Sequence, residues 1–149
     1  LYIAAFLLGF NSYAQENQTS SNKNVKSSEW QKLKKESDVL FSYRYDECHL
    51  KQDGIHKEEA YIQIKNLSSK TIALSWEIEL DYGYKCFNCE GNENDELKFS
   101  LTLKPNEVIE GFCGDSNPYQ LKILSKFLGG ESNSQLSDFN VKNVKITYM

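Results

Sequence analysis

Four cysteines are the residues of this 149-residue chain whose type and spacing best suit specific chemistry. Cys86 and Cys89 form a CxxC pair, while Cys48 and Cys113 stand alone in the sequence. Cysteines of an exported protein usually pair, so we predict disulfides and leave their connectivity open. A Cys48–Cys113 bridge would close a loop of about 65 residues and, on the chain-entropy model, contribute on the order of 4 kcal/mol.

Two other uses of the same cysteines stand as alternatives. Four thiolates that include a CxxC spacer are a zinc-binding pattern, so a structural zinc site is one of them. A redox-active CxxC is the other, but that motif normally opens a helix, whose dipole lowers a thiol pKa, and nothing after Cys89 looks helical. A thiol-dependent enzyme or a zinc-binding protein is therefore the less favoured class.

Two histidines, His49 and His56, flank the turn signal Gln52-Asp53-Gly54. They could join a metal site, but no further ligands stand at metal-binding spacing. A solvated pair of loop histidines is therefore expected.

The segments on either side of the CxxC pair hold further candidate binding residues. Glu90, Glu93 and Asp95 lie in an Asn-rich run that does not match the ligand pattern of an EF-hand, so a solvated acidic loop is expected rather than a calcium site. Tyr82 and Tyr84 continue the series of apolar residues at every second position that runs through Trp76 and Leu80. They are either the rim of the core or an aromatic platform of the kind that carbohydrate-binding sandwiches expose.

Several function classes are disfavoured by what the chain does not contain. There is no Gly-rich phosphate loop, no serine in a nucleophile elbow and no histidine with an obvious Ser or Cys partner, so no catalytic residue, cofactor or bound metal is predicted. The net charge of −4 argues against nucleic acid and anionic membrane as partners, because both attract a basic surface.

The first residues have the features of a secretory signal. An apolar run from Leu1 to Phe10 is followed by Ser12-Tyr13-Ala14, a small-x-small pattern, so we predict a signal peptide over 1–14 and a bacterial protein that is secreted or periplasmic. Ten apolar residues are too few to span a bilayer, which needs about twenty, so no membrane span is expected after cleavage. Residues 15–37 are predicted to be a disordered linker with a short helix over Ser28 to Glu36.

The remaining residues, 38–149, show the two-residue apolar alternation of β-strands. The clearest example runs from Ala60 to Tyr84 and predicts a β-hairpin around a polar turn at 66–70. A change of phase near Asn143 predicts a β-bulge. We expect an antiparallel β-sandwich of about seven strands with immunoglobulin-like proportions, its other strands being Val39 to Leu50, Leu97 to Leu103, Val108 to Cys113, Tyr119 to Leu128 and Phe139 to Tyr148.

If successive strands alternate in direction, all four cysteines arrive at one pole of this sandwich. The loops there are 49–57, 83–95 and 114–118, and loops on a rigid sandwich commonly bind partners. The predicted binding surface at this pole comprises His49, His56, Tyr82, Tyr84, Glu90, Glu93 and Asp95. The predicted function is non-catalytic binding or structural support, with a protein or glycan of the cell envelope as partner and a carbohydrate-binding module as the first alternative.

Overall fold

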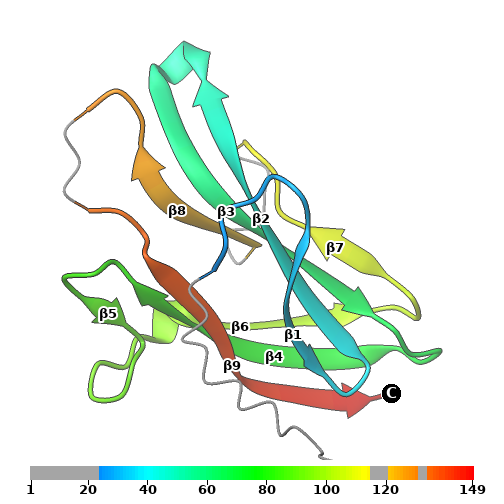
Figure 1. Ribbon diagram of the computed structural model, residues 1–149. Helices are drawn as coiled ribbons and strands as arrows, with labels where there is room; N and C mark the ends of the chain where they lie inside the picture. The colour runs from blue at the N-terminus through cyan, green and yellow to red at the C-terminus, as the bar shows by residue number, and fades with distance from the viewer. Residues whose placement is uncertain (1–23, 115–120, 131–133) are drawn as a thin grey trace, which may run out of the picture.

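The computed structural model describes residues 24–114, 121–130 and 134–149, which form two antiparallel β-sheets packed face to face (Figure 1). The first sheet contains β1 (Gln31–Glu36), β2 (Val39–Leu50), β3 (Ile55–Asn66), β7 (Val108–Glu110) and β8 (Lys122–Phe127). The second contains β4 (Ile72–Asp81), β5 (Cys86–Phe87), β6 (Lys98–Leu103) and β9 (Asp138–Tyr148). The predicted all-β sandwich is confirmed.

The described ranges include two short 3₁₀ turns, η1 (Lys51–Asp53) and η2 (Asp95–Leu97). No helix in those ranges is long and apolar enough to cross a membrane.

The core lies between the sheets and is formed by the side chains that alternate along the strands. Every second residue from Val39 to Tyr45 in β2 and from Ile72 to Ile78 in β4 is buried there. The rings of Phe41 and Trp76 lie 6.1 Å apart between centroids. Burying one large apolar side chain stabilises a fold by about 1.5–3 kcal/mol. The inward residues of these two strands are Val39, Phe41, Tyr43, Tyr45, Ile72, Leu74, Trp76 and Ile78.

The segment from Ala60 to Tyr84 is not a β-hairpin, and that prediction is wrong. β3 hydrogen-bonds to β2, β7 and β8 in the first sheet, whereas β4 hydrogen-bonds to β5, β6 and β9 in the second. The chain therefore crosses between the sheets after Asn66. Two-residue alternation shows that each strand has one buried face, but the pattern is the same for strands that pair in one sheet and strands that face each other across a core.

Asn66 holds this crossover together from the interior. Its Nδ2 donates to the carbonyl oxygens of Lys70 and Lys104, each at 2.8 Å, and its Oδ1 accepts from the backbone N and the Oγ of Ser68. Lys104 lies between β6 and β7, where the chain returns to the first sheet. One buried side chain thus satisfies backbone groups at both crossovers, as buried polar groups require.

The segment before β2 also differs from its prediction. The helix expected from Ser28 to Glu36 is absent, and β1 pairs antiparallel with β2 instead. Trp30 and Leu33 are the only large apolar residues in it, so a helix would have little apolar surface to bury. The edge of β2 offers backbone hydrogen-bond partners, so this segment is more stable as a strand paired with β2 than as a helix.

Part of the predicted linker is bound to the sandwich. The backbone N of Tyr45 donates to the carbonyl oxygen of Ser27 at 2.7 Å, and Nδ2 of Asn24 donates to that of Phe139 at 2.8 Å. The predicted signal peptide, 1–14, and linker residues 15–23 lie outside the described residues.

The bulge predicted near Asn143 is confirmed. Ser75 lies opposite Lys145 and Glu77 opposite Lys142, so β9 has one more residue than β4 between these pairs. Asn143 has a φ of 49°, in the left-handed region that a bulge residue can adopt. The extra residue returns the apolar side chains after it to the core face.

β7 and β8 are two parts of one interrupted edge strand. Both pair antiparallel with β3 along the same edge, β7 beside Gln63–Lys65 and β8 beside Lys57–Tyr61. The strands predicted over Val108 to Cys113 and Tyr119 to Leu128 therefore run in the same direction, with an insertion between them. The two ends of the insertion meet, because Gly111 packs directly against the backbone of Leu121.

We predict that Gly111→Ala disrupts this junction. A Cβ on Gly111 would lie 1.9 Å from the carbonyl oxygen of Leu121, so the edge strand must open, and the free energy of unfolding should fall by about 1–3 kcal/mol. Guanidinium denaturation measures the loss. Gly130→Ala is the control, because its Cβ would meet nothing within 4 Å; equal losses in both variants would contradict the prediction.

Candidate functional site

The four cysteines form two disulfides, Cys48–Cys113 and Cys86–Cys89, so the prediction of disulfides is confirmed. Their Cα atoms lie 5.4 and 5.8 Å apart, within the usual range for a bridge. No cysteine remains free. The thiols that a tetrathiolate zinc site or a catalytic cysteine would use are therefore all oxidised.

The two bridges stabilise different parts of the sandwich. Cys48–Cys113 joins β2 to the insertion after β7, whereas Cys86–Cys89 closes a small loop at β5 in the other sheet. The end of β2 and strand β5 lie well apart in Figure 1, because the strands of the two sheets cross at an angle. The alternation of strand direction correctly predicted that Cys48 and Cys113 lie at the same end of the sandwich. The prediction that Cys86 and Cys89 join them there is wrong.

A cavity of about 600 Å³ opens between the sheets on the side formed by β8, β5 and η2. We call it the edge groove. Its walls combine aromatic and aliphatic side chains with amide, hydroxyl and charged groups. The lining residues are Leu80, Tyr82, Tyr84, Phe87, Asn94, Glu96, Leu97, Leu124, Ser125, Lys126, Phe127 and Ser134.

An adjoining cavity of about 240 Å³ extends the groove toward the core. It shares part of the lining and adds inward residues of β4, β6 and β8. The groove therefore follows the seam along which the two sheets separate. The shared residues are Leu80, Tyr82, Glu96, Leu97 and Leu124.

Tyr82 ties the two sheets together inside the groove. Its hydroxyl donates to the carbonyl oxygen of Leu124 in β8 at 2.7 Å, although Tyr82 itself follows β4 in the other sheet. Burial, followed by the neighbouring Tyr84, raises the pKa of Tyr82 above its usual value, so the phenol stays protonated and keeps donating. The width of the groove is thus set by a hydrogen bond at its floor.

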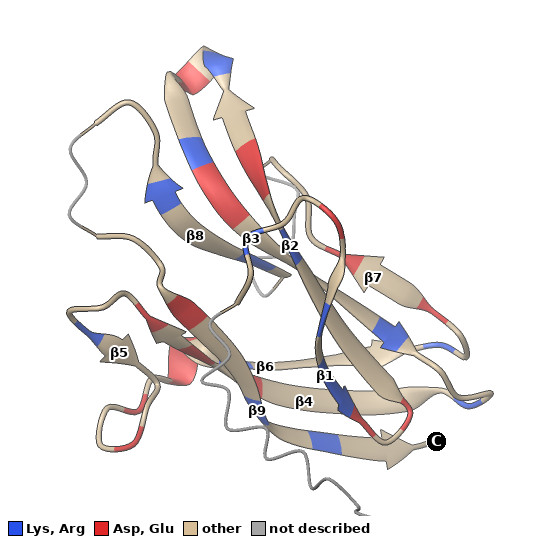
Figure 2. Cartoon of the chain, viewed as in Figure 1, with Lys and Arg blue, Asp and Glu red and all other residues tan. Residues whose placement is uncertain are grey.

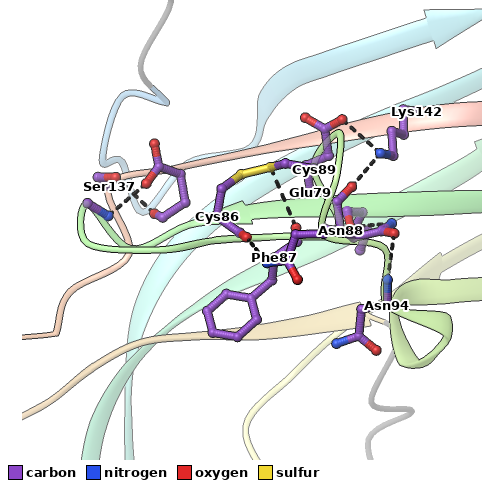
Figure 3. Close-up of a disulfide and its surroundings, with 12 residues drawn as sticks. Glu79, Cys86, Phe87, Asn88, Cys89, Asn94, Ser137 and Lys142 are labelled. Carbon is purple, nitrogen blue, oxygen red and sulfur yellow. Dashed lines mark hydrogen bonds and ion pairs between the residues drawn. A yellow bond between two sulfur atoms is a disulfide. The ribbon is translucent and has the colours of Figure 1, made fainter.

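The Cys86–Cys89 bridge positions Phe87 as a wall of the groove. In Figure 3 the ring of Phe87 points away from the disulfide, on the side opposite the sulfurs. It meets Tyr82 edge-on at 5.9 Å between centroids, and Nζ of Lys85 lies 4.7 Å from its centroid. A ring held between a disulfide and two neighbours loses little freedom on binding a ligand.

Asn88, between Phe87 and Cys89, anchors this loop to the second sheet. Its Nδ2 donates to the carbonyl oxygen of Ile78 at 3.1 Å, and its Oδ1 accepts from the backbone N of Asn94 at 3.1 Å. The φ of 59° at Asn88 is one that Asn tolerates better than most residues. Asn94 lines the groove, so the buried amide of Asn88 also fixes that wall.

Lys142 of β9 holds the same loop from the other side. Its ammonium donates to the carbonyl oxygen of Asn88 and pairs with Glu79 at 2.9 Å (Figure 3). The wall formed by the disulfide loop is therefore linked to β4 and β9 as well as to its own strand.

Two exposed aromatic side chains flank the mouth of the groove. Tyr84 is 67% exposed and Phe127 is 54% exposed, values far above those of the core rings. They come from opposite sheets, Phe127 from the end of β8 and Tyr84 from the turn after β4. Large apolar rings exposed beside a cavity are typical of an interaction site.

A second cavity, of about 570 Å³, lies on the opposite side between β1 and β9. Its lining is mostly amide and charged side chains, and its rings, Tyr43 and Phe139, are buried. It offers a ligand no exposed aromatic surface, so the edge groove is the stronger candidate.

The structure distributes the residues of the predicted binding surface over three places. Tyr82 and Tyr84 line the edge groove. His49 and His56 form a pair at the far end of β2 and β3. The acidic residues lie in the loop after β5, where Figure 2 shows a cluster of negative charge: Glu90, Glu93 and Asp95 are all exposed and none lines the groove.

Asp95 pairs with Lys98 at 2.7 Å. A hydrogen bond from Lys98 and its charge lower the pKa of Asp95, so this carboxylate is already partnered. Among the described residues, no three His, Cys, Asp or Glu side chains group as metal ligands.

Sequence reasoning missed Phe87, Asn88, Asn94 and Phe127. For Phe127 a signal existed, because it continues the inward parity of Ile123 and Ser125 at the end of a strand, where the opposite sheet no longer covers it. The others come from a loop whose course depends on a disulfide, and no periodicity reveals them.

No protein-family model, curated protein or solved structure matches this chain.

Proposed function

We propose that this chain is an exported, non-catalytic binding module and that the edge groove is its ligand site. The exposure of Tyr84 and Phe127 on either side of a preformed cavity carries this proposal. Both rings would lose water on contact with a ligand, and each can contribute on the order of 1–2 kcal/mol to binding.

Two further observations support it. The floor and one wall of the groove are held by the Tyr82 hydrogen bond and by the Cys86–Cys89 bridge, so little ordering is required when a ligand binds. Two disulfides favour an oxidising compartment, in line with the predicted signal peptide and with a secreted or periplasmic location.

Two classes of ligand suit the edge groove, and one of them is a carbohydrate. The composition of the groove favours it. Exposed aromatic faces stand beside hydroxyl-binding groups, namely the amide of Asn94, the carboxylate of Glu96 and the ammonium of Lys126. Sugar rings present an apolar face and a polar rim, so this mixture suits them. A protein segment of the cell envelope with apolar side chains is the other ligand class.

We predict that Tyr84→Ala and Phe127→Ala each weaken ligand binding by about tenfold or more, a loss of about 1.4 kcal/mol. Because both side chains are exposed, stability should change by less than about 0.5 kcal/mol. The measurement is NMR titration of the labelled chain with oligomers of glucose, xylose and N-acetylglucosamine, and with a mixture of unstructured peptides.

Phe112→Ala is the matched control, because Phe112 is a similarly exposed ring outside the groove lining. Its affinity should equal that of the unaltered chain. Shifts confined to the cavity between β1 and β9 would overturn the site, and chemical conversion of a bound oligomer would overturn the non-catalytic role. Binding of peptides alone would eliminate the carbohydrate candidate.

A further inference from the structure

The two histidines of the chain face each other across the β2–β3 ladder. His49 lies directly opposite His56, and the turn that contains η1 connects the two strands just beyond them. Their Nδ1 atoms are 2.8 Å apart and their ring centroids 5.0 Å apart. The chain contains no other histidine, so both of its imidazole side chains belong to this pair.

Glu47 orients one of these rings. Its Oε2 lies 3.0 Å from Nε2 of His49, which must carry the proton for that contact because a carboxylate can only accept. Nδ1 of His49 then presents a lone pair toward His56. A carboxylate that fixes the tautomer of an imidazole in this way is the usual outer partner of a metal-binding histidine.

The backbone on which the pair sits is restrained on both sides. His49 follows Cys48, whose disulfide ties β2 to the insertion after β7. The carbonyl oxygen of His56 accepts from the backbone N of Leu128 at 2.8 Å. The side chains themselves are exposed, so they can turn to converge on an ion without moving the strands.

We propose that His49 and His56 form a two-imidazole binding site for Cu²⁺. The 2.8 Å between the two Nδ1 atoms is an N–H···N hydrogen bond, which His56 donates to the lone pair of His49. When the proton of His56 moves to its Nε2, both Nδ1 lone pairs face the same point, and two nitrogens about 2.8 Å apart fit neighbouring positions of a square-planar ion bound at about 2.0 Å. Imidazole nitrogen is a preferred ligand of Cu²⁺, which also binds most tightly among the divalent first-row ions.

The site supplies two protein ligands and leaves the remaining positions to solvent. No third metal-ligating side chain joins the pair among the described residues. The site is separate from the edge groove, whose lining contains neither histidine. It therefore stands independently of the proposed binding function.

The experiment is a titration of the full chain with Cu²⁺ alone in a non-coordinating buffer, with a competing chelator to measure affinity. We expect an electron paramagnetic resonance spectrum with two imidazole nitrogens. His56→Gln should remove one nitrogen and weaken binding by about tenfold or more. Glu47→Gln should keep both nitrogens and weaken binding by about tenfold, the usual effect of losing an outer partner.

Two controls separate the pair from other copper-binding groups. Glu90→Gln makes the same chemical change as Glu47→Gln at an exposed carboxylate elsewhere and should leave affinity unchanged. The double variant His49→Gln/His56→Gln measures copper held by the amino terminus and the rest of the chain. Equal affinity in the double variant and the unaltered chain would overturn the proposal.

A second measurement needs no substitution and so does not depend on the folding of a variant. Cu²⁺, whose unpaired electron broadens nearby NMR signals, is added in small amounts to the full chain labelled with ¹⁵N at histidine, where only two imidazoles give signals. Both imidazole signals should broaden together, and their loss should be complete at one ion per chain. Broadening of neither ring, or of one alone, would contradict a shared site.

Discussion

Removing the Cys48–Cys113 bridge with the double variant Cys48→Ser/Cys113→Ser lowers the free energy of unfolding by about 2–5 kcal/mol; this is the largest single loss that we expect. The bridge spans 65 residues of sequence, and on the chain-entropy model a loop of that length contributes about 4 kcal/mol by restricting the unfolded chain. Guanidinium denaturation under non-reducing conditions measures the loss. Replacing both sulfurs avoids leaving a reactive thiol.

The matched control is the other disulfide, removed as Cys86→Ser/Cys89→Ser. It spans only 3 residues of sequence, so the same model assigns it about 2 kcal/mol. The first variant should therefore be the less stable, while the second should weaken binding in the edge groove by freeing Phe87. The reverse order of stability would show that loop closure is not what the longer bridge contributes.

Asn66→Ala is expected to lower the free energy of unfolding by about 2–4 kcal/mol. The substitution leaves the carbonyl oxygens of Lys70 and Lys104 and the backbone N of Ser68 without their partner, and each unsatisfied buried group costs about 1–3 kcal/mol. Neighbouring groups and water recover part of this sum. Because both crossovers lose contacts, the loss should exceed that of a typical surface amide.

Two variants test this reading of Asn66. Asn140→Ala changes an exposed amide on β9 and should stay within about 0.5 kcal/mol of the unaltered chain. Asn66→Asp keeps the acceptor but places a carboxylate against two carbonyl oxygens, so it should cost at least as much as alanine. A stable Asn66→Asp variant would mean that the two amide donations do not support the crossovers.

The strands were predictable wherever one face of the segment is buried. The residues from Ile72 to Leu80 alternate between the core and the outer face, and the phase change in β9 located the bulge at Asn143. Both signals are local, because a side chain's direction along a strand depends only on its position in the repeat. β1 lacked such a signal and was mistaken for a helix.

The edge groove was only partly predictable. Tyr82 and Tyr84 were found because they continue the parity of β4 beyond the core. Phe87 was not, because its position depends on the Cys86–Cys89 bridge and on the buried amide of Asn88. His49 and His56 were placed correctly beside one turn, but their convergence follows from the residue-by-residue register of the β2–β3 ladder.

Local patterns in the amino-acid sequence are enough to assign the buried face of each long strand, to predict an all-β fold and to show that the cysteines can pair. The sheet that each strand joins, the sulfurs that meet and the rings that line a common groove depend on tertiary contacts. The apparent hairpin at Ala60 to Tyr84 shows where prediction from local patterns ends and tertiary contacts become necessary. Its alternation is local, whereas the choice between pairing within one sheet and facing across a core depends on contacts with β7, β8 and β9, which lie far away in sequence.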